Sequence, residues 1–203
     1  MTNCTFPREL WTDEILKRVE SGATVATLLQ LKCALKLAIT EDNVDLVHYI
    51  LESDPQRCNR LLILDAIHSE SPKCLEYFHQ HGEQLTSDDL LEAVEVGNLD
   101  CLRYICEQGI LPDENPEYQS VYEVAFAHGH VECFQYLHES GFSLPTNLTE
   151  IAIKCVASTD INCPRNRYYQ GDEAILACVK YLNSIGYQWD TSLNYSYYWH
   201  ELM

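Results

Sequence analysis

The chain has 203 residues, of which 13 are Lys or Arg and 31 are Asp or Glu, so its formal net charge is −18. Proteins that bind nucleic acid need basic side chains to contact the phosphates, and an anionic membrane repels an acidic surface, so the charge excludes both as direct partners. Hydrophobic residues make up 46% of the chain, which is enough for a folded core.

The N-terminal sequence MTNCTFPRELWTDEILKRVE is charged and has no apolar run of the kind found in a secretory signal. No segment of the sequence has the roughly 18 apolar residues that a membrane-spanning helix needs. We therefore expect a protein of the cytoplasm or nucleus. Its ten cysteines should be reduced thiols, and none of them forms a C-x-x-C pair.

Residues 1–34 are expected to form N-terminal capping helices for the repeats that follow. Within them, FPRELWTDEILKRVESG at 6–22 resembles the start of an F-box, a motif that opens with Pro-x-Glu-Leu, here Pro7, Glu9 and Leu10. That resemblance implies docking onto a subunit of a ubiquitin ligase. A plain capping helix is the alternative interpretation.

One pattern recurs between residues 35 and 190, and it is centred on a tyrosine. The tyrosines are Tyr49, Tyr77, Tyr104, Tyr136 and Tyr181. A leucine or cysteine lies three residues before each one, and a glycine lies five residues after each of the last four. An alanine lies eleven residues before each of the first four, at Ala38, Ala66, Ala93 and Ala125. When the copies are aligned, these residues form regular columns, which predict about five copies of one structural unit.

Each unit is expected to contain two short helices, as the copy around Ala93 illustrates. Acidic Asp88 and Asp89 suit the start of a first helix, and Gly97 ends it. The segment LDCLRYICEQ then places apolar residues at helical spacing, and Gly109 can adopt the left-handed conformation that ends a helix. The cysteines at 74, 101, 133 and 178 share one position of the repeat, which indicates packing rather than reactivity.

Two of these copies, AVEVGNLDCLRYICEQG at 93–109 and AFAHGHVECFQYLHESG at 125–141, resemble ankyrin repeats. The frequent Cys and Tyr, together with GYQWD at 186–190, resemble the divergent ankyrin repeats of giant amoebal viruses. The resemblance implies an all-α, ankyrin-like helical repeat solenoid that binds proteins without catalysis inside a host cell. The spacing between copies predicts shortened inter-repeat loops.

The fifth copy is interrupted by an insertion at 156–173, which is either a functional surface loop or a neutral expansion between helices. Residues 191–203 should form a C-terminal capping half-repeat, with an exposed aromatic patch as the alternative.

No motif for a hydrolase, a phosphate-binding loop or a dinucleotide site occurs in the sequence, so we expect no catalytic residue, no cofactor and no metal. His128 and His130 lie close to Cys133 in the sequence, and one interpretation of this group is a metal site. The ankyrin resemblance instead makes the Gly-His pair a structural hydrogen-bonding turn, and this is the interpretation we adopt.

The negative charge is concentrated in the middle of the chain. Residues 61–153 contain only Lys73 and Arg103 against 17 acidic residues, while both ends are close to neutral. Either this is a solvated acidic face or it binds a basic protein segment. The ankyrin resemblance implies that first helices and inter-repeat loops form the binding face, which selects Glu70, Asp88, Asp89, Glu92, Glu95, Asp113, Glu114, Glu117 and Glu123. Two other functions remain open, a ubiquitin-ligase adaptor acting through 6–22 and an acidic mimic of nucleic acid.

Overall fold

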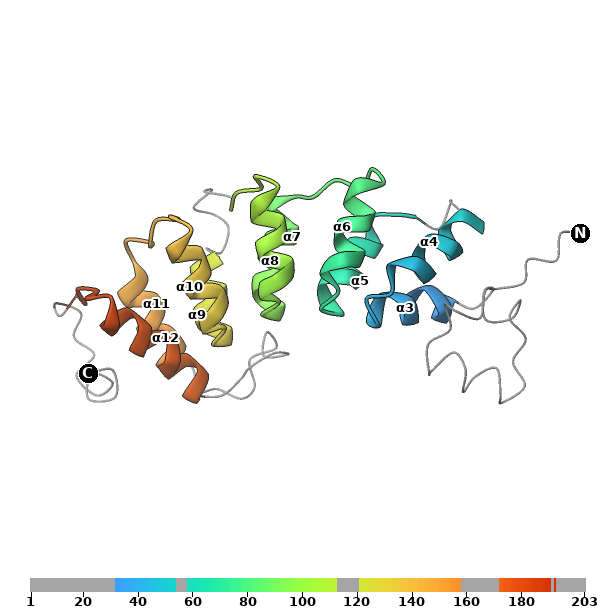
Figure 1. The fold of residues 1–203 in the computed structure, drawn as a ribbon. Coiled ribbons are helices and arrows are strands. Elements are labelled where there is room, and N and C mark those ends of the chain that lie inside the picture. Colours follow the sequence, from blue (N-terminus) through green and yellow to red (C-terminus); the bar gives the residue numbers. More distant parts are fainter. Residues whose placement is uncertain (1–31, 54–57, 113–120, 158–171, 191, 193–203) are drawn as a thin grey trace, which may run out of the picture. The chain divides into compact units, whose positions relative to one another are not determined.

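The computed structural model describes residues 32–53, 58–112, 121–157, 172–190 and 192 (Figure 1). Throughout that part of the chain the structure is built from helices, turns and irregular segments, without a strand. The chain divides into two compact units, residues 1–85 and 86–203, and each is described by itself. Nearly all of the predicted capping segments and of the insertion lies outside the described residues, and helix α3 already begins at Lys32.

The first unit contains two helix pairs, each made of a first and a second helix. The helices are α3 (Lys32–Thr40), α4 (Val44–Ser53), α5 (Leu61–His68) and α6 (Pro72–Gln80). The first helices α3 and α5 pack against each other, and so do the second helices α4 and α6. The unit therefore has two helical layers.

The second unit continues the same arrangement with three pairs. Its helices are α7 (Ser87–Val96), α8 (Leu99–Glu107), α9 (Val121–His128), α10 (Val131–Glu139), α11 (Leu148–Ala157) and α12 (Asp172–Ser184). The first helix α9 lies between α7 and α11, and the second helix α10 lies between α8 and α12. First helices thus form one layer and second helices the other.

The alanine and cysteine columns of the sequence lie inside these layers. Ala38, Ala66, Ala93, Ala125 and Ala152 are all 0% exposed, because each lies where its first helix meets its neighbours. Cys74, Cys101, Cys133 and Cys178 are also 0% exposed, which confirms their expected packing role. Small side chains at these positions let helices approach closely, and larger residues such as Phe78, Phe126 and Phe134 fill the remaining core.

A residue with positive φ separates the two helices of a pair. In the second unit these residues are Gly97 and Gly129, with φ of 83° and 71°. In the first unit the same position holds Asp42 and Glu70, with φ of 48° and 55°. The predicted helix end at Gly109 is confirmed by its φ of 79°.

The fifth helix pair differs from the others because the insertion separates its helices. Helix α12 has 13 residues, whereas α8 and α10 have nine each. Its additional first turn packs against the preceding pair, since a Cβ atom added at Gly129 would overlap Ala174. Ala174 of the longer helix therefore lies beside Gly129, as His130 lies beside Gly97 in the preceding pair.

Candidate functional site

The acidic residues predicted to bind a partner have different surroundings in the structure. Asp88 is exposed at the start of α7, while Glu92 and Glu95 on α7 and Glu123 on α9 are half-buried. Helices α7 and α9 pack against each other, so these four carboxylates lie on one layer of the second unit. Asp113, Glu114 and Glu117 lie outside the described residues.

Asp89 is fully buried and caps its own helix. One of its carboxylate oxygens accepts the backbone N–H of Thr86 at 2.8 Å and the Thr86 hydroxyl at 2.9 Å. This contact satisfies a backbone donor at the helix start, for which no backbone carbonyl within the helix is available. Asp89 therefore holds α7 in place, and we leave it out of the contact set considered below.

Glu70 is exposed, but its position is set by the backbone. It is the positive-φ residue between α5 and α6, in the first unit. A residue with a side chain is strained in this conformation, which glycine adopts at the equivalent positions of the second unit. Glu70 belongs to the first unit, so it is described apart from the carboxylates of α7 and α9.

Glu95 participates in the junction between the third and fourth helix pairs. Its backbone carbonyl accepts a hydrogen bond from Nε2 of His130 at 3.1 Å, which requires the proton to be on Nε2. The rings of His128 and His130 stack with centroids 6.0 Å apart. Burial lowers the pKa of both imidazoles, and contacts with Glu95 oppose that shift only in part. His130 is thus the structural hydrogen-bonding group that the Gly-His pair predicts.

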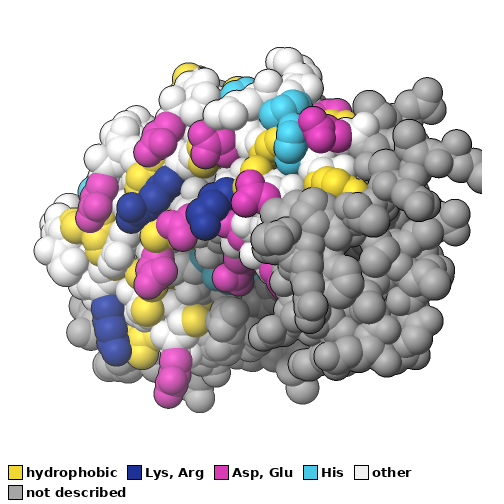
Figure 2. Space-filling model, turned by 45° about the vertical axis from the view of Figure 1, so that its right-hand side comes forward, with side chains coloured by type: hydrophobic (Ala, Val, Ile, Leu, Met, Phe, Trp, Pro, Cys, Tyr) yellow, Lys and Arg dark blue, Asp and Glu magenta, His cyan; other side chains and the backbone are white. Residues whose placement is uncertain are grey.

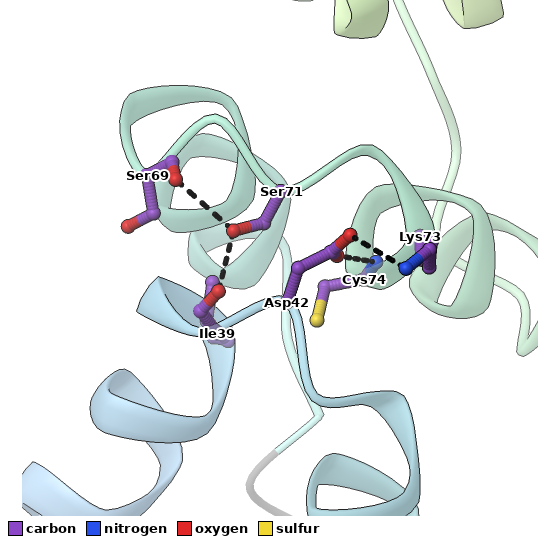
Figure 3. Close-up of polar contacts among 6 residues, drawn as sticks. All are labelled: Ile39, Asp42, Ser69, Ser71, Lys73 and Cys74. Carbon is purple, nitrogen blue, oxygen red and sulfur yellow. Dashed lines mark hydrogen bonds and ion pairs between the residues drawn. The ribbon is translucent and has the colours of Figure 1, made fainter. Parts of the chain in front are cut away.

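A different set of side chains holds the two pairs of the first unit together (Figure 3). The Ser71 hydroxyl donates to the carbonyl of Ile39, across the junction. The Asp42 carboxylate accepts the backbone N–H of Cys74 at 2.9 Å and pairs with Lys73 at 3.8 Å. Ser71 lies at the position that His130 occupies in the fourth pair, and each of these two residues links its pair to the preceding one.

Three of the repeated tyrosines also link successive second helices, a role that the sequence analysis did not assign. In the first unit, Tyr77 hydrogen-bonds with His48 of the preceding pair at 3.0 Å. In the second unit, the guanidinium of Arg103 lies 5.4 Å from the ring centroid of Tyr136, and Tyr181 hydrogen-bonds with His138 at 2.8 Å. The signal was present in the regular tyrosine spacing, but spacing alone does not show which neighbour a side chain touches.

Four further exposed carboxylates of the middle repeats lie on second helices, which the sequence analysis did not select. Asp100 and Glu107 on α8 and Glu132 and Glu139 on α10 are all exposed. Their sequence signal is regular, because an acid lies four residues before Tyr104 and Tyr136 and another lies three residues after each of them. On the face drawn in Figure 2, acidic side chains are spread over the described surface with Lys and Arg among them.

Two cysteines of the repeated position are fully buried in the second unit. Burial raises the pKa of the Cys133 and Cys178 thiols to about 12, so both stay protonated and unreactive near neutral pH. Within the described ranges, no three His, Cys, Asp or Glu side chains are grouped so that they could hold a metal ion. Among the helices described, none is long and apolar enough to span a membrane.

No protein-family model matches the chain, and no curated protein matches it. Among solved structures, the chain is similar to the crystal structure of the human ASB11 ankyrin repeat domain. The similarity has a TM-score of 0.52 at 17% sequence identity and covers 75% of this chain and 68% of the other. At this identity the likeness concerns the fold, and it confirms that this all-α chain is built from ankyrin-like helical repeats.

Proposed function

We propose that the chain is a non-catalytic scaffold whose acidic middle repeats bind a Lys- or Arg-rich segment of another protein. Ankyrin-like helix pairs present side chains on a preformed surface, which lowers the entropy lost on binding. The resemblance of the repeats to those of giant amoebal viruses supports a host protein as the partner, in the cytoplasm or nucleus of the infected cell.

The observation that carries the proposal is the charge of residues 61–153, a segment that contains 17 acidic residues and only two basic ones, Lys73 and Arg103. Both cations already have intramolecular contacts, with Asp42 and with the Tyr136 ring. The carboxylates of the middle repeats therefore have almost no basic side chains of the same segment to neutralise them. A surface of one sign speeds encounter with an oppositely charged partner and selects against like-charged ones.

The proposed contact residues follow from the ankyrin-like repeat position. On the described part of the second unit they are Asp88, Glu92, Glu95 and Glu123, and in the first unit Glu70. Asp113, Glu114 and Glu117 complete the set in a segment outside the described residues. Charge-assisted hydrogen bonds from Arg to such carboxylates are stronger than neutral ones.

Affinity purification from host-cell lysate at low and at high salt, followed by mass spectrometry, tests the proposal. We expect partners with basic segments that are lost at high salt, because exposed charge pairs are screened. Partners that stay bound at high salt and lack basic segments would contradict the proposal.

The same experiment separates the two alternative functions. Ubiquitin-ligase subunits that disappear when Pro7→Ala and Leu10→Ala are combined would favour the adaptor function of residues 6–22. Capture of DNA-binding proteins that added DNA displaces would favour a mimic of nucleic acid.

A further inference from the structure

We propose that His128 and His130 form a pH-sensitive joint between the third and fourth helix pairs, and that protonation of this joint weakens the binding of a basic partner segment. This inference rests on the proposed function and adds a regulation of the same contact residues. It concerns two side chains that the proposed function does not use.

The two histidines lie where the fourth helix pair turns from its first helix to its second. His128 is the last residue of α9, and His130 is the residue before α10. Gly129 lies between them, and a Cβ atom added to it would overlap Ala174 of α12. The His130 ring packs against Gly97 at the end of α7. The joint is therefore in contact with the third, fourth and fifth helix pairs.

The contacts of His130 fit a neutral imidazole. Its Nε2 donates to the backbone carbonyl of Glu95 at 3.1 Å, so Nε2 carries the single proton of the neutral ring. The ring is also in close contact with Gly97, since even a methyl group at that position would overlap it. The side chain is half-buried there, and burying a charge costs free energy. The closed joint therefore favours the neutral form.

The second imidazole makes a charge in the joint still less favourable. The rings of His128 and His130 are nearly parallel, with an interplanar angle of 10° and centroids 6.0 Å apart. Two imidazolium charges at this distance repel each other, so the pair accepts a second proton less readily than the first. Burial and the neighbouring His128 both lower the pKa of His130. Protonation therefore favours a state in which the rings are further apart or more exposed to water.

A residue of α7 acts in part against this effect. The charge of Glu95 raises the pKa of His128, and its backbone carbonyl raises that of His130, but burial outweighs both contributions. The pKa of each imidazole therefore lies below the ordinary value of 6.5. As the pH falls below about 6.5, an open joint binds more protons than the closed one and becomes more populated. Further ionisable side chains on the described helices packed around the pair include Glu92 on α7, Glu123 on α9, Glu132 and His138 on α10, Glu150, Lys154 and Cys155 on α11, and Glu173 on α12.

The joint couples to binding because it holds together the two helices that carry the proposed contact residues. Glu92 and Glu95 lie on α7, and Glu123 lies on α9, which packs against α7. Protonated imidazoles place positive charge near Glu95 and repel the Lys or Arg side chains of a bound segment. An open joint also changes the spacing between the carboxylates of α7 and that of α9. Protons and the basic segment therefore oppose each other's binding.

Isothermal titration calorimetry of the full chain tests this inference with a peptide of four Lys-Arg-Gly repeats, at pH 7.5 and pH 5.5 and at one ionic strength. The Lys and Arg charges are the same at both pH values, whereas histidine titrates between them. We expect the dissociation constant to be about fivefold larger at pH 5.5. Equal affinity at both pH values would overturn the inference and leave the proposed function standing, and no binding at pH 7.5 would overturn both.

A double variant and a matched control assign the effect to the joint. The double variant combines His128→Asn with His130→Asn, and the control is His138→Asn, which removes a half-buried histidine of α10 outside the joint. We expect the ratio of the two dissociation constants to fall below about twofold in the double variant and to stay near about fivefold in the control. The same ratio in both variants would overturn the inference.

Hydrogen exchange of the unaltered chain tests the joint without a substitution. The amides of Asn98 and His130 close the turns that end α7 and α9, each through a hydrogen bond of 2.9 Å, and the amide of Phe142 closes the turn that ends α10 through one of 3.2 Å. After correction for intrinsic exchange rates, protection at Asn98 and His130 should fall about fivefold from pH 7.5 to pH 5.5, while protection at Phe142 should change by less than about twofold. Equal changes at all three amides would overturn the inference.

Discussion

Gly97 provides the sharpest test of how the third and fourth helix pairs fit together. Its φ of 83° favours glycine, and a Cβ atom placed there would lie 2.9 Å from Cγ of His130 and closer still to Nδ1 and Cε1. Gly141 has a similar φ of 89°, but an added Cβ would meet nothing within 4 Å. Gly141→Ala therefore measures the backbone cost alone, while Gly97→Ala measures that cost and the overlap with the ring.

The magnitudes follow from these two environments. Alanine in the left-handed region costs about 1–2 kcal/mol. Part of this cost is offset, because alanine gives the unfolded chain less conformational freedom than glycine does. Gly141→Ala should therefore lower the free energy of unfolding by about 1 kcal/mol. In Gly97→Ala the imidazole must also move away from the Glu95 carbonyl, which loses its 3.1 Å hydrogen bond. A partly buried acceptor left without a partner adds about 1–3 kcal/mol.

Equilibrium urea denaturation, followed by far-ultraviolet circular dichroism, measures the free energies of unfolding of both variants. A second pair of measurements, made in a His130→Ala background, removes the ring. The extra cost of Gly97→Ala over Gly141→Ala should then fall below about 0.5 kcal/mol. Equal costs for both glycines in the natural chain, or an extra cost that persists without the ring, would refute the reasoning.

Four further predictions concern other features of the repeats. Burial keeps the pKa of His128 and His130 below that of an exposed histidine, so the unfolded chain binds more protons than the folded chain does. The free energy of unfolding should therefore fall as the pH drops below about 6.5. Melting temperatures measured across pH should show a shallower fall in the double variant His128→Asn plus His130→Asn. Thr86→Ala should cost about 1 kcal/mol in urea denaturation by removing the hydroxyl that donates to Asp89, whereas Asp88→Asn on the exposed side should change stability far less. Glu70→Gly should stabilise the first unit by about 1 kcal/mol, because the φ of 55° at this position strains a residue with a side chain. Asp42→Gly should raise the free energy of unfolding by less, because it also loses the hydrogen bond from the Cys74 N–H. Equal gains would show that this hydrogen bond contributes nothing to stability. In iodoacetamide labelling read by mass spectrometry, the Cys133 and Cys178 thiols, with pKa raised to about 12, should react only after urea is added, and rapid labelling of the folded chain would contradict their burial.

The sequence predicted the features of the fold that repeat. The columns of Ala93 and Cys101 identified buried positions, Gly97 and Gly109 marked helix ends, and His130 was expected to be a structural hydrogen-bonding group. These features depend on local backbone geometry and on side-chain size, which the residue types themselves express.

The candidate site was harder to predict because it depends on exposure. Asp89 and Asp88 are adjacent in the sequence, yet one is buried in a cap and the other is exposed. The strained backbone of Glu70 is visible only when it is aligned with Gly97, and the partner of each tyrosine depends on how neighbouring helices stack. The acids of α8 and α10 were overlooked because the ankyrin resemblance directed attention to the first helices.

The junctions described above have a consequence for assembly, since each one is closed by different chemistry. Ser71 and Asp42 close one junction by hydrogen bonds, His130 closes another by filling the space beside Gly97, and Ala174 closes a third against Gly129. Identical repeats fit one another in any order, and they fit the repeats of another copy equally well. Here an exchanged repeat would leave a carbonyl without its donor or place a side chain where only glycine fits. The order of the repeats is therefore encoded in their contacts, and mispairing between copies is disfavoured by the same residues that stabilise the fold.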